Sequence, residues 1–117
     1  MSIADMHMQA MHYALDGLAR RGEVRAHNVG NAETPGYQAA GVDFESALAD
    51  ALVRRDVAAT RPAGMYLRPT LPDIHGNTVD LEIETVEMLE DGLLTEAMSS
   101  SYSAKVNRLR NAMGGPR

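Results

Sequence analysis

Four histidines are the side chains best suited to metal binding or proton transfer: His7, His12, His27 and His75. His7 and His12 are five residues apart, which places them on different helix faces, whereas a helical zinc pair needs a spacing of four. The chain has no cysteine, so thiolate ligands and disulfides are excluded. We therefore expect packing or surface histidines, with no metal site and no cofactor.

An acidic run and a serine cluster are the other candidates for catalysis. The acidic run at 80–91 places some carboxylates on one helix face, but no glycine-turned loop accompanies it to form a calcium site. Ser99, Ser100, Ser101 and Ser103 lack the strand–turn–helix context of a nucleophilic serine. The acidic run therefore predicts a solvated face or one that meets arginines. A small enzyme is the least favoured class, and no catalytic residue is assigned.

Composition restricts the class of protein further. The 117 residues have a formal net charge of −5, which argues against nucleic-acid binding because such proteins concentrate basic side chains on one face. Aromatic residues make up only 4% of the chain, which contains 8 methionines, and this composition favours helix seams over a dense core. No apolar run reaches the ~18 residues of a membrane-spanning helix. The N-terminus lacks the basic and apolar segments of a cleavable signal peptide.

Two long helical patterns occupy the ends of a single domain, residues 1–117. Residues 1–30 and 78–113 repeat apolar positions at spacings of three and four, as in a coiled coil, and Asn77 or Thr78 is the expected N-cap of the second helix. The seam positions expected to mediate assembly are Met8, Met11, Leu15 and Leu18 in the first helix and Val79, Ile83 and Val86 in the second.

Charge predicts how these two helices pair. The second half of the first helix carries Arg20, Arg21 and Arg25, whereas the acidic run begins the second helix. An antiparallel pair brings these opposite charges together. Because exposed ion pairs contribute only about 0–1 kcal/mol each, we expect charge to set the orientation and apolar seams to supply most of the attraction. The predicted fold is mainly α, an antiparallel coiled-coil-like pair of terminal helices with a short helix and an irregular middle.

The segment that follows the first helix carries a specified turn. Thr34-Pro35-Gly36-Tyr37 reads as a tight turn, because proline fixes its own φ and glycine permits a positive φ. We interpret Asn28, Asn31 and Thr34 as residues that cap backbone groups, and Tyr37 as an aromatic anchor. A helix that ends at such a turn predicts an architectural role, with residues 28–37 part of the assembly site.

The middle of the chain is divided by its prolines and glycines. Residues 31–42 form a turn segment, and 43–55 are predicted to be a short helix with Asp43 as its cap. Residues 56–77 contain Pro62, Pro69 and Pro72, which exclude a long helix. We expect a flexible loop there, with a short extended piece around 65–67.

Two sequence blocks resemble a known family. The segment AHNVGNAETPGYQAAGVDF, residues 26–44, and the block GNTVDLEIE, residues 76–84, are similar to motifs of bacterial flagellar rod proteins, most of all the proximal-rod subunit of the basal body. The blocks and their flanking helices cover about two thirds of the chain.

The resemblance implies a structural subunit of the periplasm-spanning rod, which assembles with other rod subunits through its terminal helices and transmits torque. It also implies export from the cytoplasm by the flagellar type III apparatus, and neighbours that include the motor ring and the export gate. The alternative from the helices alone is a soluble helical adaptor or regulator of a secretion or signalling system, which leaves the turn unexplained.

Overall fold

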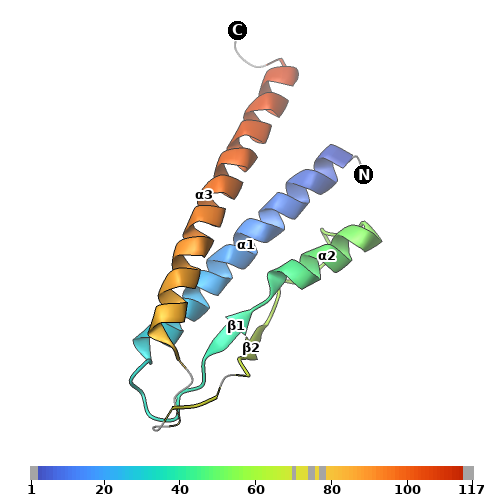
Figure 1. The fold of residues 1–117 in the computed structure, drawn as a ribbon. Helices are drawn as coiled ribbons and strands as arrows, with labels where there is room; N and C mark the ends of the chain where they lie inside the picture. The colour runs from blue at the N-terminus through green and yellow to red at the C-terminus, as the bar shows by residue number, and fades with distance from the viewer. Residues whose placement is uncertain (1–2, 70, 74–75, 77–78, 115–117) are drawn as a thin grey trace.

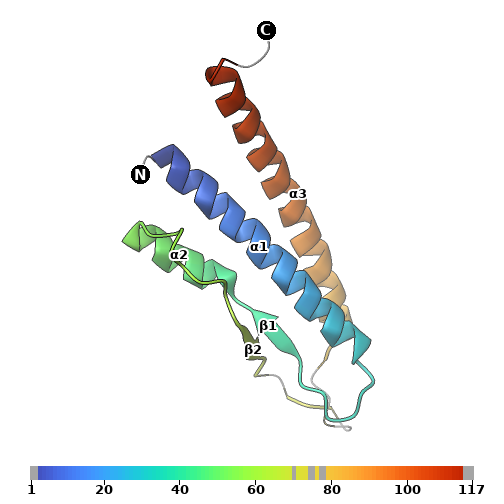
Figure 2. The ribbon, with the colours of Figure 1, turned by 180° about the vertical axis from the view of Figure 1, so that it is seen from behind.

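The structure, a computed structural model, describes residues 3–69, 71–73, 76 and 79–114. Three helices and a two-stranded ribbon make up an elongated molecule of 62 × 31 × 14 Å, in which α1 lies between α2 and α3 (Figures 1 and 2). In chain order the elements are α1 (Ile3–Gly30), β1 (Ala40–Val42), α2 (Phe44–Arg54), β2 (Met65–Leu67) and α3 (Leu81–Ala112).

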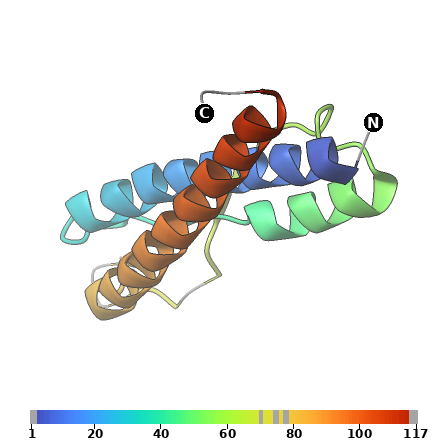
Figure 3. The same ribbon diagram turned by 90° about the horizontal axis from the view of Figure 1, so that it is seen from above.

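The two long helices run antiparallel, as the sequence predicted. Lys105, near the end of α3, donates to Nδ1 of His7 at 2.9 Å, while the start of α3 meets the second half of α1. Seen from above, α3 crosses over α1 (Figure 3). The mainly helical fold is thus confirmed, and α3 continues without a break through Gly92 and the serine cluster.

The turn after α1 also forms as expected. The amide of Tyr37 donates to the carbonyl of Thr34 at 3.1 Å, and Gly36 has a φ of 77°. Proline followed by a glycine with positive φ is the signature of a type II turn. The chain therefore reverses immediately after α1 and returns along it as β1 (Figure 1).

The caps of α2 and α3 are both aspartates, of which one was predicted. Asp43 accepts from the amide of Ser46 at 3.1 Å, as expected. The cap proposed for α3, Asn77 or Thr78, is wrong: α3 starts at Leu81, and Asp80 accepts from the amides of residues 82 and 83 at 3.0 and 3.2 Å. A carboxylate satisfies two free amides and complements the positive end of the helix dipole. Asn77 and Thr78 themselves lie outside the described residues.

The structure contains a two-stranded β ribbon, one strand of which lies in the segment predicted to be a turn. The extended piece at 65–67 is confirmed as β2, but its partner β1 lies inside the segment 31–42, for which no strand was predicted. The strands pair antiparallel, with Gly41 opposite Tyr66. Each strand has only three residues, too short for the alternating pattern that identifies a strand.

The apolar core lies between α1 and α2 rather than between α1 and α3. Ala14, Leu18 and Phe44 form its centre, and Met98 is the residue of α3 that packs against it. Among the described residues of α3 no apolar side chain is fully buried. The contact between the long helices therefore combines partly buried apolar side chains of α3 with polar groups, and the expectation that apolar seams supply most of the attraction stays a prediction.

Alanine substitutions at two glycines of α1 test this core, because we expect them to change the free energy of unfolding in opposite directions. A Cβ on Gly17 would lie 2.3 Å from the Phe44 ring, whereas a Cβ on Gly22 would meet nothing within 4 Å. Gly17→Ala should lower the free energy of unfolding by about 1–3 kcal/mol through overpacking, and Gly22→Ala should raise it by roughly 0.5–1 kcal/mol through helix propensity. Urea unfolding followed by circular dichroism measures both, and two changes of the same sign would contradict this packing.

Candidate assembly site

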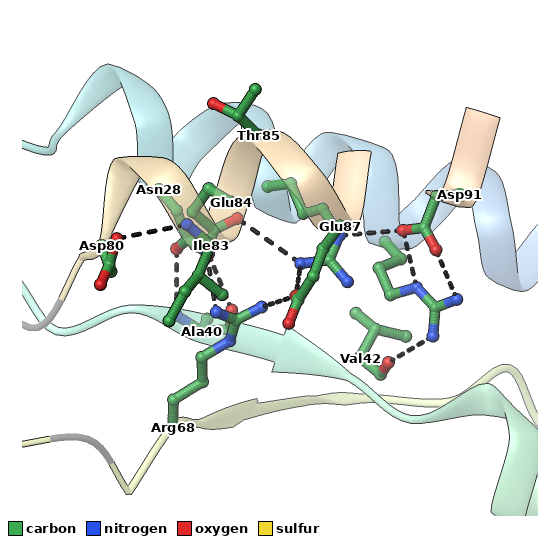
Figure 4. Close-up of polar contacts among 12 residues, drawn as sticks. Asn28, Ala40, Val42, Arg68, Asp80, Ile83, Glu84, Thr85, Glu87 and Asp91 are labelled. Carbon is green, nitrogen blue, oxygen red and sulfur yellow. Dashed lines mark hydrogen bonds and ion pairs between the residues drawn. The ribbon is translucent and has the colours of Figure 1, made fainter. Parts of the chain in front are cut away.

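A cluster of paired charges joins α1, α3 and the β ribbon where the long helices meet. We call it the polar clamp, and its members are Arg21, Arg25, Asn28, Arg68, Glu84, Glu87 and Asp91. Figure 4 shows that residues of α3 and Arg68, which follows β2, approach each other above the ribbon. The members come from three segments that are distant in sequence, so the clamp forms only when the fold does.

Two arginines of α1 supply the first half of the clamp. Arg21 and Arg25 are one turn apart, so they lie on the same helix face. Arg21 donates to both carboxylate oxygens of Asp91 at 3.0 and 2.8 Å, and Arg25 donates to the same carboxylate at 2.9 Å. Arg25 also pairs with Glu87. These forked, charge-assisted contacts fix the register of α3 along α1.

The centre of the clamp is the carboxylate of Glu84, which is fully buried. It lies 2.7 Å from Nη1 of Arg68 and 3.5 Å from Nη1 of Arg25, and it accepts from Nδ2 of Asn28 at 3.2 Å. A buried carboxylate is tolerated only when it is paired and hydrogen-bonded. Glu84 therefore requires α1 and the segment after β2 to be in place together.

Asn28 joins the turn and the strand to the clamp. Its Nδ2 donates to the carbonyl of Ala40 at 2.9 Å, and its Oδ1 accepts from the amide of Ala40 at 3.0 Å and from the hydroxyl of Tyr37 at 3.2 Å. Asn28 thus caps backbone groups as predicted, but these groups belong to β1 and not to the end of α1. Asn31 does cap α1, since its Nδ2 donates to the carbonyl of His27 at 2.9 Å.

Arg21 extends the clamp to α2. It donates to both carboxylate oxygens of Glu45 at 2.8 and 2.9 Å, and its guanidinium carbon lies 4.7 Å from the centroid of the Phe44 ring. An arginine over an aromatic ring gains a further electrostatic attraction. A single side chain of α1 therefore contacts both helices that flank it.

The electrostatics of the clamp favour ionised Asp91. Burial alone would raise the pKa of Asp91, but hydrogen bonds from Arg21 and Arg25, together with their charges, outweigh burial and lower that pKa. The same pairing raises the pKa of both arginines against the opposing effect of their burial. All three groups therefore carry full charge at neutral pH.

This shift predicts sensitivity to acid. Because the pKa of Asp91 is lower in the folded state than the ~3.9 of an unfolded chain, its contribution to stability is present above that value and is lost as pH falls through the folded pKa. We expect the free energy of unfolding to fall less steeply in Asp91→Asn than in the unchanged protein, measured by urea unfolding from about pH 7 down to about pH 3. Glu96→Gln, at an exposed position, is the control. Identical slopes for Asp91→Asn and the unchanged protein would contradict this interpretation.

The opposite face of α3 carries uncovered apolar side chains. Val86, Leu89 and Leu93 are 54%, 66% and 69% exposed, and their spacing of three and four places them in one row, which we call the outer stripe. Exposed apolar rows of this kind on a helix typically mark an interaction surface. The clamp fixes the inner face of α3 and leaves this row facing away from α1.

Relatives similar in sequence cover most of this chain. The flagellar basal body rod protein FlgB of Escherichia coli is 31% identical over 129 residues, covering 93% of this chain and 94% of the relative. FlgB of Salmonella typhimurium is 28% identical and covers 95% of each chain, and FlgB of Cereibacter sphaeroides is 30% identical and covers 81% of this chain. This chain belongs to the FlgB family. No family model matches the sequence.

The FlgB match confirms the resemblance found in the two sequence blocks. The structure places the predicted assembly residues in several environments. Met11 and Leu18 are buried inside the subunit, while Met8, Leu15 and Val79 are half-buried. Ile83 and Val86 are exposed, and Asn28 and Tyr37 are at the clamp. Asn31, Thr34, Pro35 and Gly36 lie in the turn. The assembly role of the whole set stays a prediction.

The sequence of this FlgB-family chain did not predict that Arg68 belongs to the clamp. It stands beside Pro69 in a segment predicted to be a flexible loop, and nothing in its spacing relates it to Glu84. The pairing of Arg21 and Arg25 with the acidic start of α3, by contrast, was predicted and is confirmed.

The remaining chemical candidates occupy ordinary positions. His12 lies 3.5 Å from Asp16, and His75 is outside the described residues. Within residues 3–69, 71–73, 76 and 79–114, histidines and carboxylates form no group of three that could bind a metal ion. None of the described helices combines the length and the apolar character needed to cross a bilayer.

Proposed function

We propose that this FlgB-family chain is a structural subunit of the proximal part of the flagellar basal-body rod. It assembles with other rod subunits and transmits torque across the periplasm. The observation that carries the proposal is the match to FlgB over almost the entire chain, together with an α3 that is clamped on one face and apolar on the other.

The polar clamp would keep the helices of the subunit in fixed positions while the rod transmits torque. Torque passes through a subunit only if its elements keep their relative positions under load, and forked ion pairs with a buried carboxylate resist sliding of α3 along α1. The outer stripe then meets neighbouring subunits as one side of a rigid pair. Torque thus passes from one subunit to the next through helix contacts.

The proposal extends to partners and location. The subunit leaves the cytoplasm through the flagellar type III export apparatus without cleavage of a signal peptide, and it meets the motor ring and the export gate at the base of the rod. These neighbours follow from the sequence resemblance, and the exposed surface of α3 supplies a face for contacts of this kind.

A deletion strain tests the proposed function. Loss of a rod subunit should stop assembly beyond the motor base and abolish swimming, and the intact gene supplied from a plasmid should restore both. Electron microscopy of purified basal bodies and swimming in soft agar measure the two results. Reduced but otherwise normal filaments would favour a helical adaptor instead, and unchanged swimming would refute the proposal.

A further inference from the structure

The end of α3 carries a second uncovered surface. Lys105 contacts His7, which leaves only about one more turn of α1 to cover α3 before the described part of α1 begins at Ile3. The inner row of α3, in which Met98 and Tyr102 face α1 and the core, therefore continues past the end of α1.

That continuation is an apolar groove whose lining includes one basic residue, and we call it the α3 tip. Val106, Leu109, Arg110 and Met113 line it, and Met113 is 84% exposed. Residues 97–114 include Lys105, Arg108 and Arg110 and no acidic residue. The α3 tip thus combines apolar and positively charged surface.

The outer stripe has the complementary character. Glu82, Glu90 and Glu96 lie beside it on the helix surface, and all three are exposed. No ion pair of theirs occurs in the described part of the chain, whereas the inward-facing acids of the same helix are neutralised by the clamp. The outer stripe is therefore an apolar row within a negatively charged surface.

We propose that the α3 tip of one copy of this chain docks on the outer stripe of a second copy. Apolar burial supplies the attraction and opposite charge sets the partner and the orientation. This inference rests on the proposed function and names one of its contacts.

The position of the two surfaces decides the form of the assembly. Leu89 and Leu109 lie roughly 30 Å apart on one helix, so a copy that uses its tip keeps its own stripe free. A contact between two different surfaces is heterologous, and its repetition adds further copies as a ring or as an open helical stack, depending on the rotation between neighbours. This is the form of contact that an axial structure needs.

Because the native chain lacks cysteine, engineered cysteines can test this contact directly. Leu89→Cys and Leu109→Cys subunits, mixed and oxidised over a series of concentrations, should give a mixed disulfide several-fold more often than either variant alone. Ala19→Cys mixed with Leu109→Cys is the control, since Ala19 is exposed on α1. A yield equal to this control, or a monomer at every concentration in sedimentation velocity, overturns the proposal.

Charge reversal gives a second readout. Glu90→Lys with Glu96→Lys in the Leu89→Cys subunit should reduce the mixed disulfide, and Arg108→Glu with Arg110→Glu in the Leu109→Cys subunit should restore it. A loss that the second pair of changes does not restore counts against the docking. Failure of both experiments while the plasmid still restores swimming would remove this contact and leave the proposed function standing.

Discussion

Replacing Arg25 with methionine should lower the free energy of unfolding by about 3 kcal/mol. Arg25 is only 6% exposed, and the carboxylate of Glu84 beside it is fully buried. Removing one partner of a buried ion pair typically costs 3–5 kcal/mol, and we expect about the lower limit because Arg68 still pairs with Glu84. Urea unfolding followed by circular dichroism measures the change.

Arg20→Met is the matched control for this prediction. Arg20 is adjacent on the same helix but exposed, so its replacement should change stability by no more than about 0.5 kcal/mol. Glu84→Gln should lower the free energy of unfolding less in the Arg25→Met background than in the unchanged protein. The effects of substitutions within one ionic network are not additive. Equal effects of Arg25→Met and Arg20→Met would show that the clamp does not stabilise the subunit.

Negative charge in the outer stripe should abolish swimming without unfolding the subunit. Leu89 and Leu93 are 66% and 69% exposed, so Leu89→Glu with Leu93→Glu should change the stability of the isolated subunit by no more than about 1 kcal/mol. In the rod the same positions would be buried against apolar side chains of a neighbour, where a carboxylate in place of a leucine loses the apolar contact and must be desolvated at a cost of several kcal/mol. Complementation of the deletion strain in soft agar measures the effect.

Leu71→Glu provides the comparison for the stripe. Leu71 is also a highly exposed leucine, at 92%, but it lies in the segment between β2 and α3. We expect the Leu71→Glu strain to swim as the unchanged strain does. Normal swimming of the stripe variant, with its production confirmed by immunoblot, would mean that this face of α3 takes no part in assembly.

The sequence predicted those features of the fold that depend on local patterns. Apolar spacing identified both long helices, the Thr34–Tyr37 turn followed from proline and glycine chemistry, and Asp43 was recognised as a cap. The antiparallel orientation was predicted from charge, because that arrangement places Arg21 and Arg25 beside the acidic start of α3.

Features that depend on contacts between distant segments were not predictable in this way. The ribbon is formed by two short strands that stabilise each other across more than 20 residues, so neither strand has a pattern of its own. Arg68 takes its role from the end of β2, and Asn28 from the return of the chain along α1. The acidic run was correctly matched with arginines, but the burial of Glu84 depends on all three segments at once.

A map of the assembled basal body at side-chain resolution tests the central claim most directly. We expect the clamp between Arg25 and Glu84 to be intact in each copy of this subunit, with Leu89 and Leu93 covered by a neighbouring subunit. A map in which α3 has separated from α1, or in which these leucines face solvent, would contradict the account.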